Sequence, residues 1–276
     1  MRPILYLATL ISTAALSQGF LQSKTAAVPT ETDRQLSAAV PRTDQRKTDR
    51  SIYRELRQRL REAARKAKQV ERYSATLEQQ VVVDGREFDP ERIDIKIRRK
   101  PFSVYLRWQE DGQEVLYIEG ENDGKLLARP TRGLAAMRGV WELPPDSPHA
   151  MKGQRYPVTK LGVENLALMA IDFHNAQGIE RAIYQCRSED GTQRNRETEE
   201  FTVTFQPEQG SEFSKSILAF DRKLGLLIGV ENFGWNDDGE PGDLVERYTY
   251  LNLNPTSEIT EEDFSRENPN YSFASR

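Results

Sequence analysis

The sequence predicts an α+β protein built on one large, curved antiparallel sheet, with an N-terminal helix and an inserted helix against the concave face. Three observations support this fold class. Apolar and polar residues alternate through about eleven short segments between residues 73 and 253. Turn-forming dipeptides separate many of these segments, and strands in hairpin succession pair antiparallel. Helical periodicity appears in two stretches, one before the first strand and one in the middle of the strands.

The first helix is expected at residues 52–70. Ser51 is a suitable N-cap, and Glu55 with Arg59 forms an i,i+4 pair that favours a helix. Apolar side chains recur at steps of three and four residues and make a narrow stripe that would dock on the sheet. This stripe comprises Ile52, Leu56, Leu60, Ala63, Ala67 and Val70.

The strands form two groups that flank the second helix. Asp111–Gly112 and Asn122–Asp123–Gly124 are strong turn sequences, and Lys100–Pro101 interrupts the ladder between two strands. The strand at 113–119 is apolar on both faces. One face should meet the helices, and the other meets either solvent or a second layer. The expected strands are 73–83, 92–99, 103–110, 113–119, 125–130, 138–143, 179–188, 199–206, 213–221, 224–233 and 243–253.

The second helix is expected from a cap at Thr159 to about Asn175. Apolar residues cover nearly its whole circumference, which predicts a buried helix against the sheet. After the last strand, the isolated aromatic residues Phe264, Tyr271 and Phe273 should pin an extended C-terminal tail onto the body of the protein.

The N-terminus predicts export. Arg2 precedes an apolar run and then small residues, the pattern of a secretory signal peptide over residues 1–19 with cleavage near Ser17. Residues 20–50 are rich in Ser, Thr, Ala, Pro and charge, so we expect a disordered linker. Residues 51–276 should form a single domain, in a periplasmic or secreted protein. No other segment reaches the length of a transmembrane helix.

Charge is unevenly distributed. Residues 41–72 hold twelve Lys or Arg and five acidic residues, although the whole chain has a net charge of −4. This basic stretch is either a solvated helix face or a contact surface that uses Arg57, Arg61 and Arg65. The acidic sheet portion argues against nucleic acid as a partner. Cys186 is the single cysteine, so no internal disulfide can form, and we expect a thiol packed in the core.

The chemistry-bearing residues are few. The chain has none of the motifs HExxH, CxxC, GxSxG, GxGxxG or a P-loop. The two histidines lie 25 residues apart without a third ligand nearby, so the sequence predicts neither metal nor cofactor and assigns no catalytic residue. We expect His174 at the C-terminal end of the second helix, where a positive charge complements the helix dipole.

One loop, residues 144–157, concentrates polar groups. Asp146, His149 and Arg155 form a candidate polar site that could bind a headgroup or perform acid–base work. The alternative is that Asp146 and Ser147 bond their own backbone in turns and His149 packs the loop.

The sequence favours a binding protein that shelters an acyl chain, a lipoprotein or another apolar ligand between the curved sheet and the helix at 159–175. Two alternatives stay open. One is an envelope protein-interaction domain without a ligand, and the other is a hydrolase that uses the loop at 144–157. The expected apolar lining comprises Val104, Leu106, Trp108, Leu116, Ile118, Leu166, Met169, Ala170 and Phe173.

Four segments also carry a resemblance to known proteins: KPFSVYLRW (100–108), GENDGKLLAR (120–129), PPDSPHAMKGQRYPVTKLGVENL (144–166) and LNLNPTSEITEEDFSRENPNYSF (251–273). They resemble the secreted planctomycete family known as domain of unknown function 1571, over roughly residues 70–275. More remotely, the order of elements is similar to the outer-membrane lipoprotein sorting and carrier superfamily. That resemblance implies a half-barrel sheet, helices that plug its concave face and an acyl ligand between them. It transfers no residue roles.

Overall fold

The computed structural model describes residues 42–207 and 210–273. The predicted signal peptide, and the predicted linker as far as residue 41, lie outside these residues. The helices are α1 (Arg42–Ala67), α2 (Gly133–Met137), α3 (Val163–Asn175) and α4 (Ile179–Ala182). The strands are β1 (Arg72–Val83), β2 (Arg86–Glu87), β3 (Glu91–Arg98), β4 (Ser103–Trp108), β5 (Glu114–Ile118), β6 (Leu126–Arg129), β7 (Trp141–Leu143), β8 (Ile183–Gln193), β9 (Arg196–Phe205), β10 (Lys215–Asp221), β11 (Leu227–Trp235) and β12 (Pro241–Asn254).

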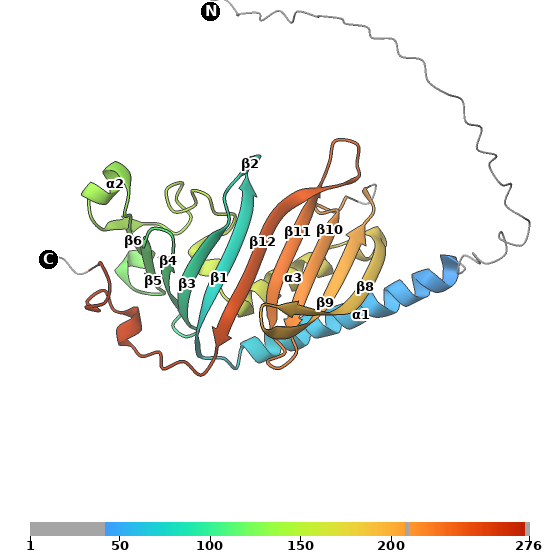
Figure 1. The fold of residues 1–276 in the computed structure, drawn as a ribbon, viewed down its shortest axis with the longest axis horizontal. Coiled ribbons are helices and arrows are strands. Elements are labelled where there is room, and N and C mark those ends of the chain that lie inside the picture. The colour runs from blue at the N-terminus through green and yellow to red at the C-terminus, as the bar shows by residue number, and fades with distance from the viewer. Residues whose placement is uncertain (1–41, 208–209, 274–276) are drawn as a thin grey trace, which may run out of the picture. The chain divides into compact units, whose positions relative to one another are not determined.

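The strands form one twelve-stranded antiparallel sheet, as predicted (Figure 1). Its order is β7-β6-β5-β4-β3-β1-β12-β11-β10-β9-β8, with the short β2 paired to β1. With the short β2 set aside, neighbours along this order are successive in sequence except at the centre, where β1 pairs with β12. The sheet is therefore two meanders joined by the first and last long strands. All eleven predicted strands occur, and only the two-residue β2 was not expected. The strand predicted at 179–188 begins at Ile183, however, because residues 179–182 form α4.

Helix α1 buries most of the predicted apolar stripe, but it begins earlier than expected and ends at Ala67, so Val70 lies beyond it. It starts at Arg42, and Ser51 lies within it, where its hydroxyl donates to the Thr48 carbonyl. The cap prediction at Ser51 is wrong because the residues from 42 onward contain no Gly or Pro and continue the helix. Leu56 and Leu60 are fully buried, and so is nearly all of Tyr53, which the stripe did not include.

Helix α3 begins after Gly162, whereas the sequence predicted a cap at Thr159. Gly162 has a φ of 103°, and a Cβ there would lie 2.8 Å from the Tyr73 hydroxyl, so glycine is required. The first backbone amides of the helix have partners on the sheet. Gly162 N donates to Tyr250 Oη at 2.7 Å, and Val163 N donates to Tyr73 Oη at 2.9 Å. These two buried tyrosines from β12 and β1 replace the predicted threonine cap.

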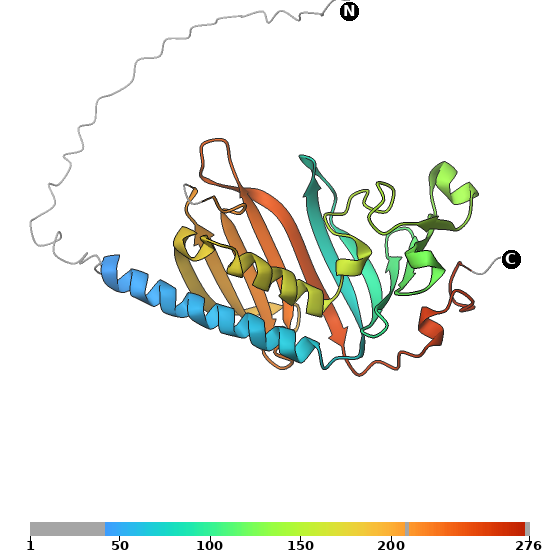
Figure 2. The same ribbon diagram turned by 180° about the vertical axis from the view of Figure 1, so that it is seen from behind.

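The sheet carries layers on both faces. Helices α1 and α3 lie on one face, called here the inner face (Figure 2). On the outer face, the C-terminal tail (residues 255–273) covers β4, β5 and β6 and buries the three predicted aromatic residues Phe264, Tyr271 and Phe273. A second layer, and not solvent, therefore explains why β5 is apolar on both faces. No helix among the described residues is long and apolar enough to span a membrane.

Candidate ligand-binding site

A pocket lies between the C-terminal half of α3 and the inner face of β10, β11 and β12. Its volume is about 250 Å³. We call it the α3 pocket. Most of its lining is apolar and comes from the helix, from the chain before β10 and from the floor of the sheet. These apolar residues are Leu166, Met169, Ala170, Phe173, Phe213, Leu218 and Val230.

The register of the sheet places two parallel rows of side chains on the floor of the pocket. The apolar row is Leu218, Val230 and Tyr248, which are directly paired across β10, β11 and β12. The adjacent row is polar and comprises Ser216, Asn232 and Glu246, paired in the same way. Because two residues separate the rows along each strand, both rows face the helices.

The polar row is buried and internally hydrogen-bonded. Ser216 Oγ donates to Asn232 Oδ1 at 2.6 Å, and Asn232 Nδ2 donates to Glu246 Oε1 at 2.7 Å. Tyr156 Oη donates to the same carboxylate oxygen at 3.3 Å. Glu246 is only 3% exposed, so its charge needs a partner within the protein.

Arg155 supplies that partner. Its Nε lies 2.8 Å from Glu246 Oε2, an ion pair without the alignment of a hydrogen bond. The same guanidinium donates to the Val82 carbonyl at 3.0 Å and contacts Glu212 at the surface. Burial lowers the pKa of Arg155, but Glu246, Tyr156 and Glu212 together raise it by more, and the net shift is upward.

The two tyrosines at this end stay neutral. Burial raises the pKa of Tyr156 to about 12, with Glu246 adding to the shift. Burial, reinforced by Glu246, also raises the pKa of Tyr248. One end of the α3 pocket is therefore polar and charge-balanced, with hydroxyl and amide groups ready to bond a ligand, while its walls are apolar.

His174 closes the other end of the α3 pocket as a neutral group. It is 2% exposed and lies edge-on to Phe173, with the Tyr53 hydroxyl 3.2 Å from its Nδ1. Burial, reinforced by the nearby Arg57 guanidinium, lowers its pKa to about 3. The prediction of a cation at this helix end is therefore wrong, because burial outweighs the helix dipole.

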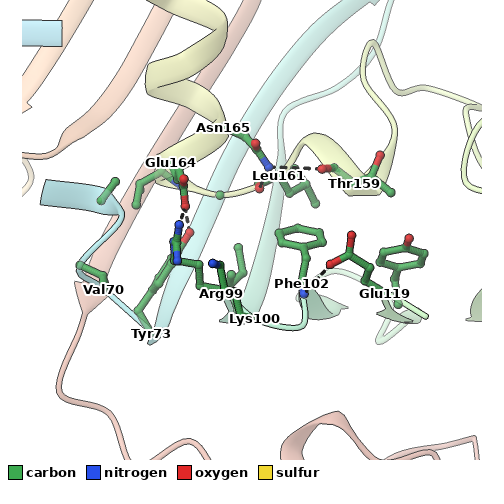
Figure 3. Close-up of a pocket in the computed structure, with 15 residues that line it drawn as sticks. Val70, Tyr73, Arg99, Lys100, Phe102, Glu119, Thr159, Leu161, Glu164 and Asn165 are labelled. Carbon is green, nitrogen blue, oxygen red and sulfur yellow. Dashed lines mark hydrogen bonds and ion pairs between the residues drawn. The ribbon is translucent and has the colours of Figure 1, made fainter. Parts of the chain in front are cut away.

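A second pocket of about 300 Å³ lies at the N-terminal end of α3 (Figure 3). Its lining is more polar. An ion pair between Arg99 Nε and Glu164 Oε2 at 2.8 Å lies in it, and Glu119 accepts from the Phe102 amide. None of the predicted lining residues contributes to this pocket, which makes it the weaker candidate for an apolar ligand.

The structure brings only part of the predicted apolar lining together. Leu166, Met169, Ala170 and Phe173 line the α3 pocket. Val104 and Leu106 are buried in the main core away from it, and Trp108 packs against that core.

Leu116 and Ile118 lie on the outer face, beneath the C-terminal tail. Tyr117 pairs with Val104, and Val115 pairs with Leu106, so these two face inward instead. Grouping Leu116 and Ile118 with Val104 was wrong, because both faces of β5 are apolar and only the pairing register tells them apart.

The predicted polar loop does not form a joint site. Asp146 and His149 are exposed, and His149 lies edge-on to Trp141. Ser147 Oγ donates to the Pro144 carbonyl at 2.8 Å and accepts from the Ala150 amide at 3.4 Å, which is the turn geometry of the alternative interpretation. Arg155 lies apart from them at the polar end of the α3 pocket.

The three arginines of the predicted basic contact surface have different surroundings. Arg61 and Arg65 are exposed on α1, whereas Arg57 donates to Asn175 Oδ1 at 2.8 Å and so connects α1 to the end of α3.

Cys186 is fully buried, as expected of a thiol packed in the core. Burial raises the pKa of its thiol to about 12, and Asp49 adds to the shift, as suits an unreactive core cysteine.

Comparison with solved structures returns proteins of low sequence identity. Lipoprotein LppX of Mycobacterium tuberculosis matches at a TM-score of 0.43 and 11% identity, covering 75% of this chain and 98% of that one. LprF of Mycobacterium bovis matches at 0.42 and 9%, covering 75% and 95%. A LolA-superfamily protein of Nitrosomonas europaea matches at 0.30 and 9%, covering 74% and 96%. No residue role follows from these likenesses.

Sequence comparison is more specific. No curated protein matches the chain. The sequence model of the family described as "Protein of unknown function (DUF1571)" matches residues 70–273, from just before β1 to the last aromatic residue of the C-terminal tail. The match covers most of the chain, and the protein belongs to the DUF1571 family.

Proposed function

We propose that the protein is an exported carrier or binding protein that shelters an acyl chain or a similar amphipathic ligand in the α3 pocket. One observation carries this proposal. Apolar walls from α3 and the sheet end at a buried, charge-balanced polar row, Ser216, Asn232 and Glu246. An acyl chain would cover the apolar walls, and its polar headgroup would exchange hydrogen bonds with this row. Burial of the chain contributes about 25 cal/mol per Å² of apolar surface.

The size of the pocket indicates how a ligand would enter. At about 250 Å³ the α3 pocket is slightly smaller than the roughly 300–1,000 Å³ that is usual for small-molecule sites. A long acyl chain therefore needs α3 to move away from the floor. The N-terminal end of α3 is bonded to the sheet through Tyr73 and Tyr250. Its C-terminal end is bonded to α1 through Tyr53 and Arg57. A swing of the C-terminal end with α1 would widen the pocket while the sheet stays fixed.

Filling the pocket with a side chain tests the proposal. Met169 lines the α3 pocket, whereas Leu168 is equally half-buried on the same helix and does not line it. We expect Met169→Trp to weaken binding of a dansyl-labelled undecanoic acid probe by roughly tenfold or more, because the indole occupies the space of the chain. Leu168→Trp is the matched control and should bind as the unmodified protein does.

Fluorescence titration of the probe measures both variants, with thermal unfolding to show that each remains folded. Equal probe affinity in both variants, or no saturable binding to the unmodified protein, would refute the α3 pocket as the ligand site.

A further inference from the structure

Helix α2 presents apolar side chains to solvent. It lies between β6 and β7 at one end of the sheet (Figure 1). Leu134 is 84% exposed and Met137 is 83% exposed, and Tyr184 is the one other large hydrophobic residue that is so exposed in the described part of the chain. Because Leu134 and Met137 are three residues apart on a helix, they share one face. Two of the three most exposed apolar side chains thus lie side by side.

The surrounding residues hold this short helix in place. Trp141 Nε1 donates to the Ala135 carbonyl at 3.0 Å, and an Arg129 guanidinium nitrogen donates to the Ala136 carbonyl at 3.1 Å. The Arg138 guanidinium lies 4.7 Å from the centre of the Trp141 ring. The carbonyls of α2 are therefore bonded from the protein side, and Leu134 and Met137 are held outward in a fixed geometry. We call residues 132–138 the α2 wedge.

The charge around the wedge is positive. Residues 124–141 contain Lys125, Arg129, Arg132 and Arg138 and no acidic residue, in a chain whose net charge is −4. Two acids lie nearby. Asp111 is 3.6 Å from Arg132, whose side chain remains 74% exposed, and Glu142 is paired with Arg266. The wedge thus joins two protruding apolar side chains to a local excess of cations.

We propose that the α2 wedge docks on an anionic lipid surface, with Leu134 and Met137 inserted among the headgroups and Arg132 and Arg138 beside the lipid phosphates. Charge complementarity favours this partner, since an anionic membrane surface attracts basic residues that lie close to it. The shape favours it as well. Two side chains on a protruding five-residue helix offer little area to a folded protein, whereas headgroups rearrange around a protrusion. Binding of this kind is weak and reversible.

Vesicle co-sedimentation tests the proposal with the purified protein. Vesicles of phosphatidylglycerol and phosphatidylcholine should bind it at about 0.1 M salt, and vesicles of phosphatidylcholine alone should bind it less. The double variant Leu134→Ser/Met137→Ser should lower partitioning by roughly tenfold, because it removes the inserted apolar surface. Tyr184→Ser changes the third exposed hydrophobic residue, on the far edge strand β8, and should have no effect.

A second pair of variants tests how much the charges of the α2 wedge contribute to vesicle binding. Arg132→Glu/Arg138→Glu should lower partitioning by roughly tenfold at low salt, and by much less near 1 M, where charges are screened. Arg61→Glu/Arg65→Glu on the exposed face of α1 is the matched control. Three results would overturn the proposal. The first is no binding to anionic vesicles, and the second is an equal loss of vesicle partitioning in the α1 control. The third is a serine double variant that loses self-association but keeps its lipid binding. The last result would assign the wedge to a second copy of the chain.

Discussion

Strands β3–β6 carry a buried layer on both faces, whereas β8–β12 carry helices on one face and polar side chains on the other. In the first half, the outer face is covered by Phe264, Tyr271 and Phe273, and Tyr271 stacks on Tyr105 at a centroid distance of 3.8 Å. In the second half, outward side chains form surface ion pairs such as Arg247–Glu231. The inner faces differ too, because β10–β12 form the floor of the α3 pocket.

The difference shows where this fold can accept a ligand. The inner face of β4 carries Val104 and Leu106, which the protein fills with its own core. The inner face of β10–β12 keeps a buried polar row that lines the α3 pocket. A buried polar group needs partners, and in a purely structural core an apolar residue would be simpler. The half formed by β3–β6 therefore contributes stability through its own core. Our proposal places the ligand in the half formed by β8–β12, called here the open half.

The largest predicted effect concerns the C-terminal tail. Phe273 is fully buried in the packed layer on the outer face. Phe273→Ala should lower the free energy of unfolding by about 3–5 kcal/mol, because it leaves a cavity in that layer. Urea denaturation measures this loss. Ser272→Ala, at an exposed side chain beside it, should change stability little. A loss below about 1 kcal/mol in Phe273→Ala would show that the tail is not a structural layer.

The next effect compares two ion pairs on opposite faces of β11 and β12. Glu246→Gln removes the partner of Arg155 inside the pocket and should cost about 2–3 kcal/mol, because the guanidinium is left poorly paired. Glu231→Gln removes the partner of Arg247 on the outer face and should cost less than about 1 kcal/mol. Chemical denaturation of both variants checks the ranking. Equal losses would mean that the polar row is not effectively buried.

A smaller effect is the pH dependence of the open half. The folded protein holds the pKa of His174 at about 3 by burial, whereas an unfolded histidine titrates near 6.5. The unfolded chain therefore binds the proton first, and stability is complete above about pH 6.5 and is lost as the pH falls. From pH 7 to pH 5 this amounts to about 2 kcal/mol.

Denaturation midpoints at these two pH values measure that change. His174→Gln should remove most of it, and His149→Gln, at an exposed position, should keep it. A pH dependence that is the same in all three proteins would contradict the assignment to His174.

The smallest expected effect concerns Cys186, whose thiol should not react in the folded protein. Cys186 lies on the inner face of β8, fully buried, with its backbone amide 3.4 Å from Asp49 Oδ1 of α1. Under native conditions a thiol reagent should leave it unmodified, and in denaturant it should react stoichiometrically. Rapid modification of the folded protein would show that α1 separates readily from the open half of the sheet.

Much of the fold follows from local patterns in the sequence. Turn dipeptides and alternation predicted the eleven strands that are longer than two residues, because both signals lie within a few residues. The tail aromatics were also predicted to pack on the body. Helix α2 was not predicted, since five residues carry no helical period, and α3 begins at Gly162 because tyrosines from two distant strands bind its first amides.

The site was harder to predict, because it depends on register. Four of the predicted residues lie together on α3 at the α3 pocket, whereas Leu116 and Ile118 were assigned to the wrong face. The polar row was missed since Ser216, Asn232 and Glu246 lie on three strands and only pairing aligns them. A partial signal exists in the sequence. Each of these residues occupies the same alternating face of its strand as a buried apolar neighbour, such as Leu218 or Val230.

Mass spectrometry of an organic extract tests the central assignment most directly. The protein would be purified without denaturant, beside Met169→Trp, Leu168→Trp and a denatured and refolded sample. We predict an amphipathic lipid near one per chain in the unmodified protein and in Leu168→Trp, and its loss from Met169→Trp and from the refolded sample. An extract without lipid from well-folded protein, or equal lipid in both tryptophan variants, would contradict ligand binding in the open half of the sheet.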